Sequence, residues 1–257
     1  MQDFREKKRR GERITSLTAY DYPTARLLDE AGIDIILVGD SLGMVVLGYE
    51  DTTEVTLDAM RHHTRAVARA VKRALLVADL PFHTYDTPAE AVQNARALVE
   101  AGAQAVKLEG GASHAEQIRA IVEAGIPLMG HIGMLPQSVR EEGGYKLKGR
   151  TPAEAEVLMA DARAVEEAGA FSVVLEIVAA ETSRQITEAI GIPTIGIGSG
   201  ESCDGQILVT HDLIGLFPWF VPKFVKPEAD VAGEIRKAVA AFIERTQPSA
   251  AAADQAS

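Results

Sequence analysis

The chain has 257 residues, 47% of them hydrophobic, and no Pro/Ser-rich linker or break in composition divides it, which favours one domain. Its net charge of -11 argues against nucleic acid as a partner, and no apolar run reaches the roughly 18 residues that cross a bilayer. The single cysteine, Cys203, excludes an internal disulfide and fits a reducing compartment. We therefore expect a cytoplasmic protein that contacts no membrane, with Cys203 as an inert residue.

The N-terminus carries the only dense cluster of basic residues. It consists of Arg5, Lys7, Lys8, Arg9, Arg10 and Arg13. A charge run of this kind is usually the solvated face of a helix, and we expect a short N-terminal basic helix. An arm that binds nucleic acid is the alternative.

A repeated helix ending organises the rest of the chain. Glu-Ala-Gly occurs at 30–32, 100–102, 123–125 and 167–169, and an apolar segment follows each time. Glycine is the residue that ends a helix in the left-handed conformation. The helix from residue 152 also begins well, with Thr151 as N-cap and Pro152 in the first turn. Helix, glycine and strand therefore alternate, as a βα repeat requires.

Eight βα units follow from this pattern. We predict strands at 14–19, 33–39, 75–80, 105–109, 127–132, 171–176, 192–198 and 220–225. We predict helices at 23–31, 55–73, 88–101, 113–124, 152–168, 181–190, 210–216 and 229–245. The pattern indicates an α/β fold, a (β/α)8 TIM barrel, with an open doubly wound sheet as the alternative. The barrel would be one domain over residues 1–246, followed by a disordered tail at 247–257.

Two predicted loops are long for simple connections in such a barrel. Residues 41–55 and 133–151 each contain several glycines and polar residues, and loops of this length are often lids or binding loops. Surface insertions are the alternative. The segment Gly196–Gly200 resembles the phosphate loop of many barrels, but glycines also serve tight turns and close packing.

Acidic residues stand where four of the predicted strands end. Asp40, Asp79 and Glu109 end the second, third and fourth strands, which are neighbours about 4.8 Å apart in a barrel. Carboxylates this close repel one another unless they are protonated or bind a cation. Oxygen ligands favour a hard ion, so we predict a Mg²⁺ site, with helix caps or arginine pairs as the alternative roles.

Three more residues extend the predicted site. Lys107 shares a strand face with Glu109 and could neutralise the acids or bind a substrate carboxylate. His131 ends the fifth strand at the same mouth, where it serves either the site or the core. Glu176 ends the sixth strand, apart from the predicted cation, and is a candidate general base. Together these residues indicate proton removal beside a carbonyl, followed by carbon–carbon bond formation.

Several motifs then resemble one known family, ketopantoate hydroxymethyltransferase. They are Leu17–Ala25 (LTAYDYPTA), Val38–Gly43 (VGDSLG), Asp79–Phe82 (DLPF), Val106–Gly111 (VKLEGG), Gly130–Gly133 (GHIG) and Asp204–Gln206 (DGQ). Their shared order makes the resemblance specific, and it extends from about residue 5 to 245.

The resemblance implies a reaction and a set of roles. A one-carbon unit would pass from 5,10-methylenetetrahydrofolate to 3-methyl-2-oxobutanoate through a Mg-bound enolate, giving 2-dehydropantoate for pantothenate biosynthesis. Asp40, Asp79 and Glu109 would be the metal ligands, and Glu176 the proton acceptor. The substrate would contact Asp40, Ser41, Asp79, Lys107 and His131. The family also implies a homo-oligomer, typically a decamer built as a pentamer of dimers.

Two other functions fit the residues less well. An isocitrate-lyase-like, Mg-dependent lyase would also act on 2-oxo acids but would need no folate. A catalytically inactive barrel that serves as an assembly scaffold would have no use for four acids at strand ends.

Overall fold

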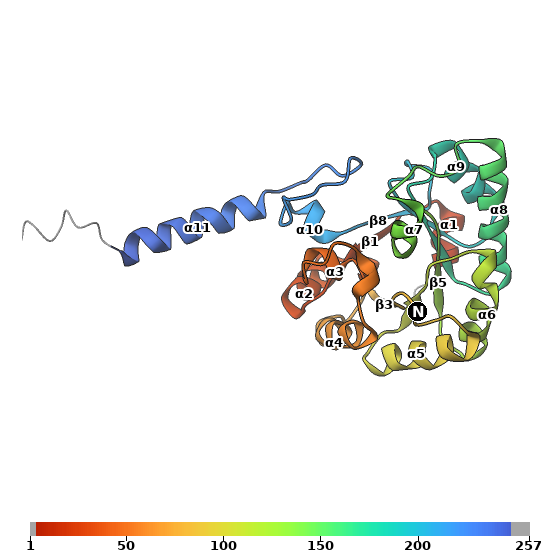
Figure 1. The fold of residues 1–257 in the computed structure, drawn as a ribbon, viewed down its shortest axis with the longest axis horizontal. Coiled ribbons are helices and arrows are strands. Elements are labelled where there is room, and N and C mark those ends of the chain that lie inside the picture. Colours follow the sequence, from red (N-terminus) through yellow and green to blue (C-terminus); the bar gives the residue numbers. More distant parts are fainter. Residues whose placement is uncertain (1–3, 248–257) are drawn as a thin grey trace, which may run out of the picture. The chain divides into compact units, whose positions relative to one another are not determined.

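The computed structural model describes residues 4–247 as a closed barrel of eight parallel strands followed by a helical C-terminal segment (Figure 1). Each strand pairs with the next in the chain, and β8 pairs with β1. The strands are β1 (Ile14–Thr18), β2 (Ile35–Val38), β3 (Leu75–Asp79), β4 (Ala105–Lys107), β5 (Leu128–Gly133), β6 (Ser172–Glu176), β7 (Thr194–Ile197) and β8 (Gly205–Leu208). Closure confirms the (β/α)8 barrel and excludes the open sheet.

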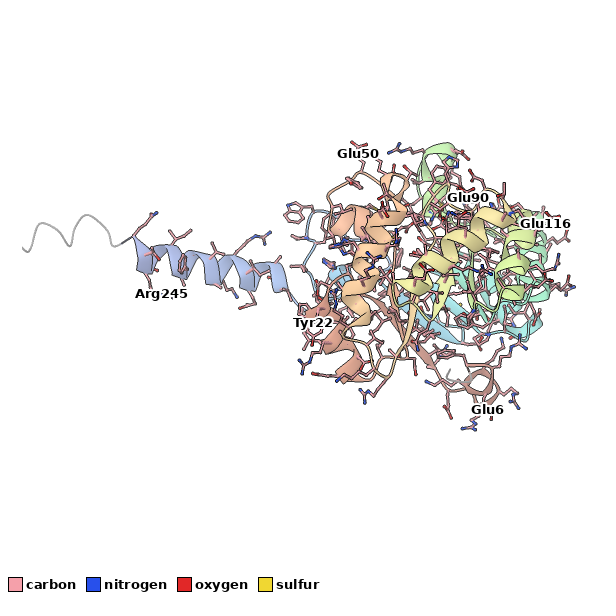
Figure 2. All side chains as sticks on the ribbon, turned by 90° about the horizontal axis from the view of Figure 1, so that it is seen from below. Glu6, Tyr22, Glu50, Glu90, Glu116 and Arg245 are labelled. Atoms are coloured by element: carbon pink, nitrogen blue, oxygen red, sulfur yellow. The ribbon has the colours of Figure 1, made fainter. Side chains whose placement is uncertain are left out.

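Helices connect these strands and cover the outside of the barrel (Figure 1). The α-helices are α1 (Phe4–Arg10), α2 (Tyr22–Ala31), α3 (Leu42–Val45), α4 (Leu57–Ala68), α5 (Pro88–Glu100), α6 (Ala115–Glu123), α7 (Val139–Glu142), α8 (Pro152–Glu167), α9 (Ala180–Ala189), α10 (Thr210–Leu213) and α11 (Val231–Thr246). Short 3₁₀ turns are η1 (Thr52–Glu54), η2 (Ala112–His114) and η3 (Pro136–Ser138). Acidic side chains such as Glu50 and Glu116 are exposed and point outward (Figure 2).

The predicted helix ends are present. The Thr151 hydroxyl accepts a hydrogen bond from the backbone N–H of Glu154, and the Glu154 carboxylate accepts one from the backbone N–H of Thr151, so α8 begins with a full capping box. Gly32 ends α2 with a φ of 89°, which is the left-handed conformation that glycine adopts without strain. Each of the eight predicted helices has an observed counterpart within a few residues, although α4 ends at Ala68 rather than 73.

Seven of the predicted strands are confirmed, and the eighth is wrong. The segment 220–225 forms no strand, although most of its residues are apolar, and it contains Pro222, which cannot donate to a strand ladder. The eighth strand is instead Gly205–Leu208, a four-residue segment in which only Ile207 and Leu208 are apolar. It fits because a side chain at Gly205 would lie only 2.5 Å from the Ile14 carbonyl oxygen, so glycine lets β8 approach β1.

Hydrophobic residues form two layers on either side of the strands. The larger layer packs between the strands and the surrounding helices, and the smaller one fills the barrel interior. Phe4 of α1 belongs to the interior layer and stacks on Phe171, with ring centroids 6.1 Å apart. Because Phe171 precedes β6, α1 closes the end of the barrel where the strands begin, which we call the base.

The basic N-terminal helix contributes to this closure. Lys7 forms an ion pair with Asp34, which precedes β2. Lys8 Nζ lies 2.9 Å from Asp204 Oδ2 and donates to the Thr187 and Ile192 carbonyl oxygens. The expectation of a solvated basic face is therefore wrong for these two lysines, because the strand-start acids bind them. Arg9 and Arg10 are exposed, as expected.

The chain divides into two compact units, one that ends at Leu208 and one that begins at Val209. The complete barrel belongs to the first unit, and α10 and α11 belong to the second. The prediction of a single domain over residues 1–246 stays a prediction. Apart from Gln247, the predicted disordered tail lies outside the described residues. No helix within residues 4–247 is long and apolar enough to cross a membrane.

Candidate active site

The four acids predicted at strand ends all lie at the opposite end of the barrel, which we call the mouth. Asp40 follows β2, Asp79 ends β3, Glu109 lies two residues after β4, and Glu176 ends β6. Asp40, Asp79 and Glu109 are at most 4% exposed. A buried carboxylate is unfavourable unless it meets a cation or hydrogen-bond donors, so the partners of these acids are informative.

Lys107 is the first of these partners. Its Nζ lies 2.8 Å from Asp79 Oδ1, in register with the neighbouring strand, and 3.2 Å from His131 Nδ1. Although burial lowers the pKa of Lys107, Asp79, Glu109 and Asp40 together raise it above its ordinary value. Lys107 is therefore a permanent positive charge inside the mouth.

His131 connects the acids of β4 and β6. Its Nε2 lies 3.2 Å from Glu176 Oε2. Its Nδ1 lies 3.5 Å from Glu109 Oε1, at the outer limit of hydrogen bonding, and this buried oxygen has no closer partner in the described chain. Burial and Lys107 lower the pKa of His131, but the two carboxylates outweigh them and raise it to about 9. His131 is thus a second cation at neutral pH.

The acids themselves are close enough to influence one another. Burial, followed by the negative charges of Asp79 and Glu109, raises the pKa of Asp40 well above its usual range. Burial also raises the pKa of Asp79, whose Oδ2 accepts a hydrogen bond from the Asp40 backbone N–H at 3.1 Å. Although burial opposes it, His131 lowers the pKa of Glu109. The mouth therefore holds more carboxyl groups than it has cationic side chains to pair with them.

The metal-site prediction depends on the same acids. Within residues 4–247, no three Asp, Glu, His or Cys side chains are grouped as a ready-made ligand set. Asp40, Asp79 and Glu109 nevertheless lie on adjacent strand ends and supply only oxygen atoms, the donor type that Mg²⁺ prefers. Glu109 Oε1, which is buried without a full hydrogen bond, and the mutual proximity of the acids both suit a divalent cation.

Gln137 is a site residue that the sequence reasoning missed. It lies in η3 after β5 and is 3% exposed. Its Nε2 donates to Asp40 Oδ2 at 2.7 Å, and its backbone N–H donates to Glu109 Oε2 at 3.0 Å. Tyr85 completes the arrangement by donating its hydroxyl to Gln137 Oε1 at 2.5 Å. Burial and the nearby Glu109 and Asp40 raise the pKa of Tyr85, so the phenol stays protonated.

The two long loops lie beside this mouth. Ser41 follows Asp40, and its hydroxyl lies 2.8 Å from the Tyr20 hydroxyl. Arg140, in the loop after β5, lies 2.6 Å from Asp51 and 3.2 Å from Glu54, both in the loop after β2. Burial and then Glu176 raise the pKa of Tyr145, so this second loop also approaches the acids. The ion pairs join the two loops to each other.

The glycine-rich segment after β7 is engaged in local structure. Ser199 Oγ donates to the Leu175 carbonyl oxygen at 2.7 Å and accepts from the Val178 N–H at 3.0 Å. Burial raises the pKa of the nearby Cys203 thiol, which is fully buried. These contacts give the segment a packing role, and phosphate binding there stays a prediction.

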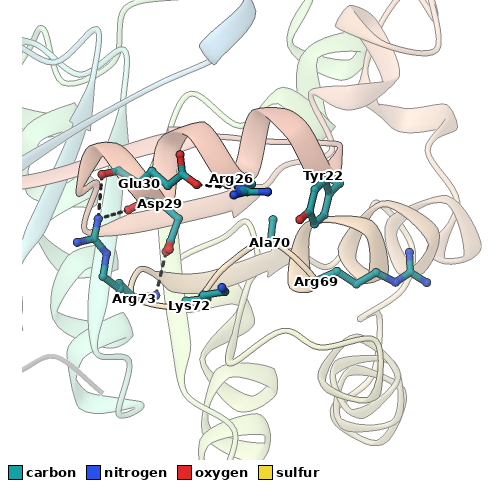
Figure 3. A pocket seen from close by; sticks show the side chains of 8 residues that line it. All are labelled: Tyr22, Arg26, Asp29, Glu30, Arg69, Ala70, Lys72 and Arg73. Carbon is teal, nitrogen blue, oxygen red and sulfur yellow. Dashed lines mark hydrogen bonds and ion pairs between the residues drawn. The ribbon is translucent and has the colours of Figure 1, made fainter.

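A cavity of about 360 Å³ lies away from the mouth, between α2 and the segment that joins α4 to β3 (Figure 3). It is lined by Tyr22, Arg26, Asp29, Glu30, Arg69, Ala70, Lys72 and Arg73. Arg26 pairs with Glu30, and Arg73 donates to the carbonyl oxygens of Asp29 and Glu30. Because no strand-end acid contributes to it, this cavity is separate from the candidate active site.

The site residues belong to a sequence with many close relatives. A family model described as ketopantoate hydroxymethyltransferase matches residues 1–250. The 3-methyl-2-oxobutanoate hydroxymethyltransferase of Moorella thermoacetica (strain ATCC 39073 / JCM 9320) is 60% identical over 88% of this chain and 84% of its own. The protein of the same name from Syntrophus aciditrophicus (strain SB) is 55% identical, over 95% of this chain and 90% of its own.

Solved structures share the fold at lower identity. A phosphonopyruvate hydrolase in complex with oxalate and Mg²⁺ has a TM-score of 0.65 and 14% identity, over 97% of this chain and 91% of that one. A 2,3-dimethylmalate lyase of the PEP mutase/isocitrate lyase superfamily has a TM-score of 0.65 and 20% identity, over 95% and 87%. At these identities the likeness concerns the barrel alone.

Proposed function

The chain belongs to the ketopantoate hydroxymethyltransferase family and is an enzyme, and we propose that it transfers a hydroxymethyl group from 5,10-methylenetetrahydrofolate to 3-methyl-2-oxobutanoate. The product would be 2-dehydropantoate, on the route to pantothenate. The buried acid cluster at the mouth supports this reaction most directly. Because these acids would repel an anionic keto acid, the mouth can bind such a substrate only together with additional positive charge, such as a divalent cation.

The charges at the mouth can be compared directly. Asp40, Asp79, Glu109 and Glu176 face two cations, Lys107 and protonated His131. A divalent cation would offset this excess of negative charge. We propose that Asp40, Asp79 and Glu109 hold Mg²⁺, directly or through water. When bound, Mg²⁺ would draw electron density from the keto acid and acidify its C3 proton.

The residues around these acids would orient the substrate. Lys107 is a fixed cation that can attract the keto acid carboxylate, and the Ser41 hydroxyl, beside Tyr20, can donate to it. Glu176 would take the C3 proton as general base, and C3 would then form a bond to the methylene carbon of the folate. Both carbon–nitrogen bonds of that methylene would break, water would supply the hydroxyl oxygen, and tetrahydrofolate would leave with its nitrogens protonated by the proton from C3 and one from the water. His131, between Glu176 and Glu109, would keep the Glu176 carboxylate oriented.

The remaining features of the proposal come from the family resemblance. We propose a cytoplasmic homo-oligomer, a decamer arranged as a pentamer of dimers. Size-exclusion chromatography with light scattering measures the mass of the assembly, and division by the protomer mass of 27.5 kDa gives the number of subunits. This experiment tests the oligomeric state alone.

Deuterium exchange at C3 of 3-methyl-2-oxobutanoate tests the assigned base. With Mg²⁺ and without folate, the wild-type enzyme should exchange this proton, and Glu176→Gln should exchange it roughly 10²–10⁴-fold more slowly. Glu116→Gln, at an exposed helix position, is the matched control and should exchange at the wild-type rate. A wild-type rate in Glu176→Gln would remove this residue from the role.

Folate dependence tests the reaction itself. Product formation from 3-methyl-2-oxobutanoate should require 5,10-methylenetetrahydrofolate. An isocitrate-lyase-like enzyme would instead act on a 2-oxo acid without folate, so turnover in the absence of folate would refute the proposed transfer.

A further inference from the structure

We infer that Gln137, with its amide oriented by Tyr85, positions Asp40 and Glu109 to receive the divalent cation of the proposed reaction. The inference rests on the proposed function, since it concerns the same acids. Gln137 touches no reacting atom and is therefore a positioning residue.

One residue binds acids from two different strands. Gln137 Nε2 donates to Asp40 Oδ2 at 2.7 Å, and its backbone N–H donates to Glu109 Oε2 at 3.0 Å. Asp40 follows β2 and Glu109 follows β4, so these bonds reach across the end of β3. The relative placement of the two carboxylates is thus set by a single rigid turn, η3, which begins with Pro136.

The orientation of the amide is also determined. Tyr85 donates its hydroxyl to Gln137 Oε1 at 2.5 Å, and Gln137 Nε2 donates a further bond to the Leu80 carbonyl oxygen at 3.1 Å. A rotated amide would place Oε1 against Asp40 Oδ2 and Nε2 against the Tyr85 hydroxyl. The rotated form loses the bonds to Asp40 Oδ2 and to the Leu80 carbonyl oxygen, because Oε1 cannot donate. Since the Gln137 side chain is buried, the observed orientation is the favourable one.

A neutral donor suits this position better than a cationic one. Gln137 orients the carboxylates through one oxygen each, Oδ2 of Asp40 and Oε2 of Glu109. It leaves Glu109 Oε1 without a full hydrogen bond, and as a neutral amide it adds no positive charge beside the two acids. A lysine or arginine here would neutralise the charge that attracts the metal. Loss of a hydrogen bond that orients a metal-binding side chain typically weakens metal affinity about 10–100-fold.

The experiment measures Mg²⁺ binding by isothermal titration calorimetry, with no substrate present. The variants are Gln137→Leu, Tyr85→Phe and the double variant, with Gln117→Leu as the matched control. Gln117 is a buried glutamine that donates to the backbone carbonyl oxygen of Asp86, and it has no hydrogen bond to the acids at the mouth. Thermal unfolding followed by circular dichroism verifies that each variant is folded.

We expect Gln137→Leu to weaken Mg²⁺ binding about 10–100-fold and Tyr85→Phe to weaken it less. Because the tyrosine acts through the glutamine, Tyr85→Phe should add nothing in the Gln137→Leu background. Gln117→Leu should bind Mg²⁺ like the wild type. If Gln137→Leu does not fold, Tyr85→Phe decides alone, since it removes one oxygen and leaves the ring.

Opposite results separate this inference from the proposed function. If folded Gln137→Leu binds Mg²⁺ with wild-type affinity, the positioning role is overturned but the proposed reaction is not. If Gln137→Leu does not fold, wild-type affinity in Tyr85→Phe has the same meaning. Equal losses in Gln117→Leu and Gln137→Leu would also overturn it, because the effect would then be general. A wild-type enzyme that bound no Mg²⁺ but carried out the folate-dependent transfer would overturn the positioning role together with the metal site.

Discussion

The acidic residues at the two ends of the barrel differ in how they are paired with cations. At the base, Asp34 and Asp204 each pair with one lysine of α1, and Thr15 and Thr194 donate further hydrogen bonds to these carboxylates. At the mouth, four carboxylates share Lys107 and His131, and an oxygen of Glu109 lacks a full hydrogen bond. Each of these acids at the base has a lysine of its own, whereas the acids at the mouth outnumber the cations beside them. Charge balance therefore distinguishes a structural end from a functional one.

Removal of Lys107 should have the largest effect. Lys107→Met leaves buried carboxylates without their fixed cation, which should lower the free energy of unfolding at pH 7 by about 3–5 kcal/mol and abolish turnover. Since burial and mutual repulsion raise the folded-state pKa values of Asp40 and Asp79, both take up protons as the pH falls. The stability deficit should then shrink toward lower pH.

Urea unfolding across this pH range checks the prediction, with Lys72→Met as the control. Lys72 is an exposed lysine, and its replacement should leave both stability and turnover unchanged. A Lys107→Met deficit that does not vary with pH would contradict the account of the mouth.

Removal of a lysine at the base should affect stability alone. Lys8→Met deletes hydrogen bonds to Asp204, Thr187 and Ile192, and should lower the free energy of unfolding by about 1–3 kcal/mol. The kcat/KM of the transfer reaction should stay at the wild-type value, because the contacts lie at the opposite end of the strands. A loss of turnover in folded Lys8→Met would show that the two ends are coupled.

Asp34 at the base should account for part of the loss of stability at low pH. Burial raises the pKa of Asp34, but hydrogen bonds from Lys7 and Thr15 lower it by more. The pKa of Asp34 therefore lies below its ordinary value. A lowered folded-state pKa gives stability that is present above the unfolded value, about 3.9, and is lost as the pH falls through the folded value. Asp34→Asn should therefore be less stable than the wild type at pH 7.

Urea midpoints between pH 3 and pH 7 check this prediction. The difference between Asp34→Asn and wild type should narrow below about pH 4, where the wild-type carboxylate begins to be protonated. A difference that stays constant over this range would exclude Asp34 as a source of acid sensitivity.

The ion pairs between the two mouth loops should have the smallest effect. Arg140 is exposed and pairs with Asp51 and Glu54, so Arg140→Gln should leave the melting temperature unchanged. Amide hydrogen exchange over residues 134–149 should quicken roughly two- to fivefold, as expected for the loss of a surface ion pair. Unaltered exchange over this segment would indicate that other contacts hold the loop in place.

The sequence predicted most of the barrel because its signals are local. Apolar runs followed by acids, as at Asp40 and Asp79, mark strand ends without knowledge of the partner strand. The eighth strand was not predicted because its position depends on contact with β1. Gly205 fits against Ile14, and no pattern of apolar residues in the sequence indicates that fit. The prediction placed the strand at the mostly apolar segment around Pro222 instead.

The site was predicted unevenly for a similar reason. Each acid has a strand in front of it, so its position follows from the pattern. Gln137 has no such signal, since a glutamine in a loop is common and becomes informative only when η3 folds back onto Asp40 and Glu109. The pairing of Lys7 and Lys8 with acids far along the chain was likewise invisible, because charge runs carry no information about distant partners.

The closure of the base by α1 has a consequence for how the chain folds. Lys8 bonds to residues 179, 184 and 196 positions away, among the longest separations between bonded residues in the barrel. Contacts of such sequence separation form slowly because the intervening chain must first be ordered. Helix α1 therefore completes its contacts only after the chain has been synthesised as far as Asp204, and until then its aromatic residue Phe4 has no finished barrel to enter.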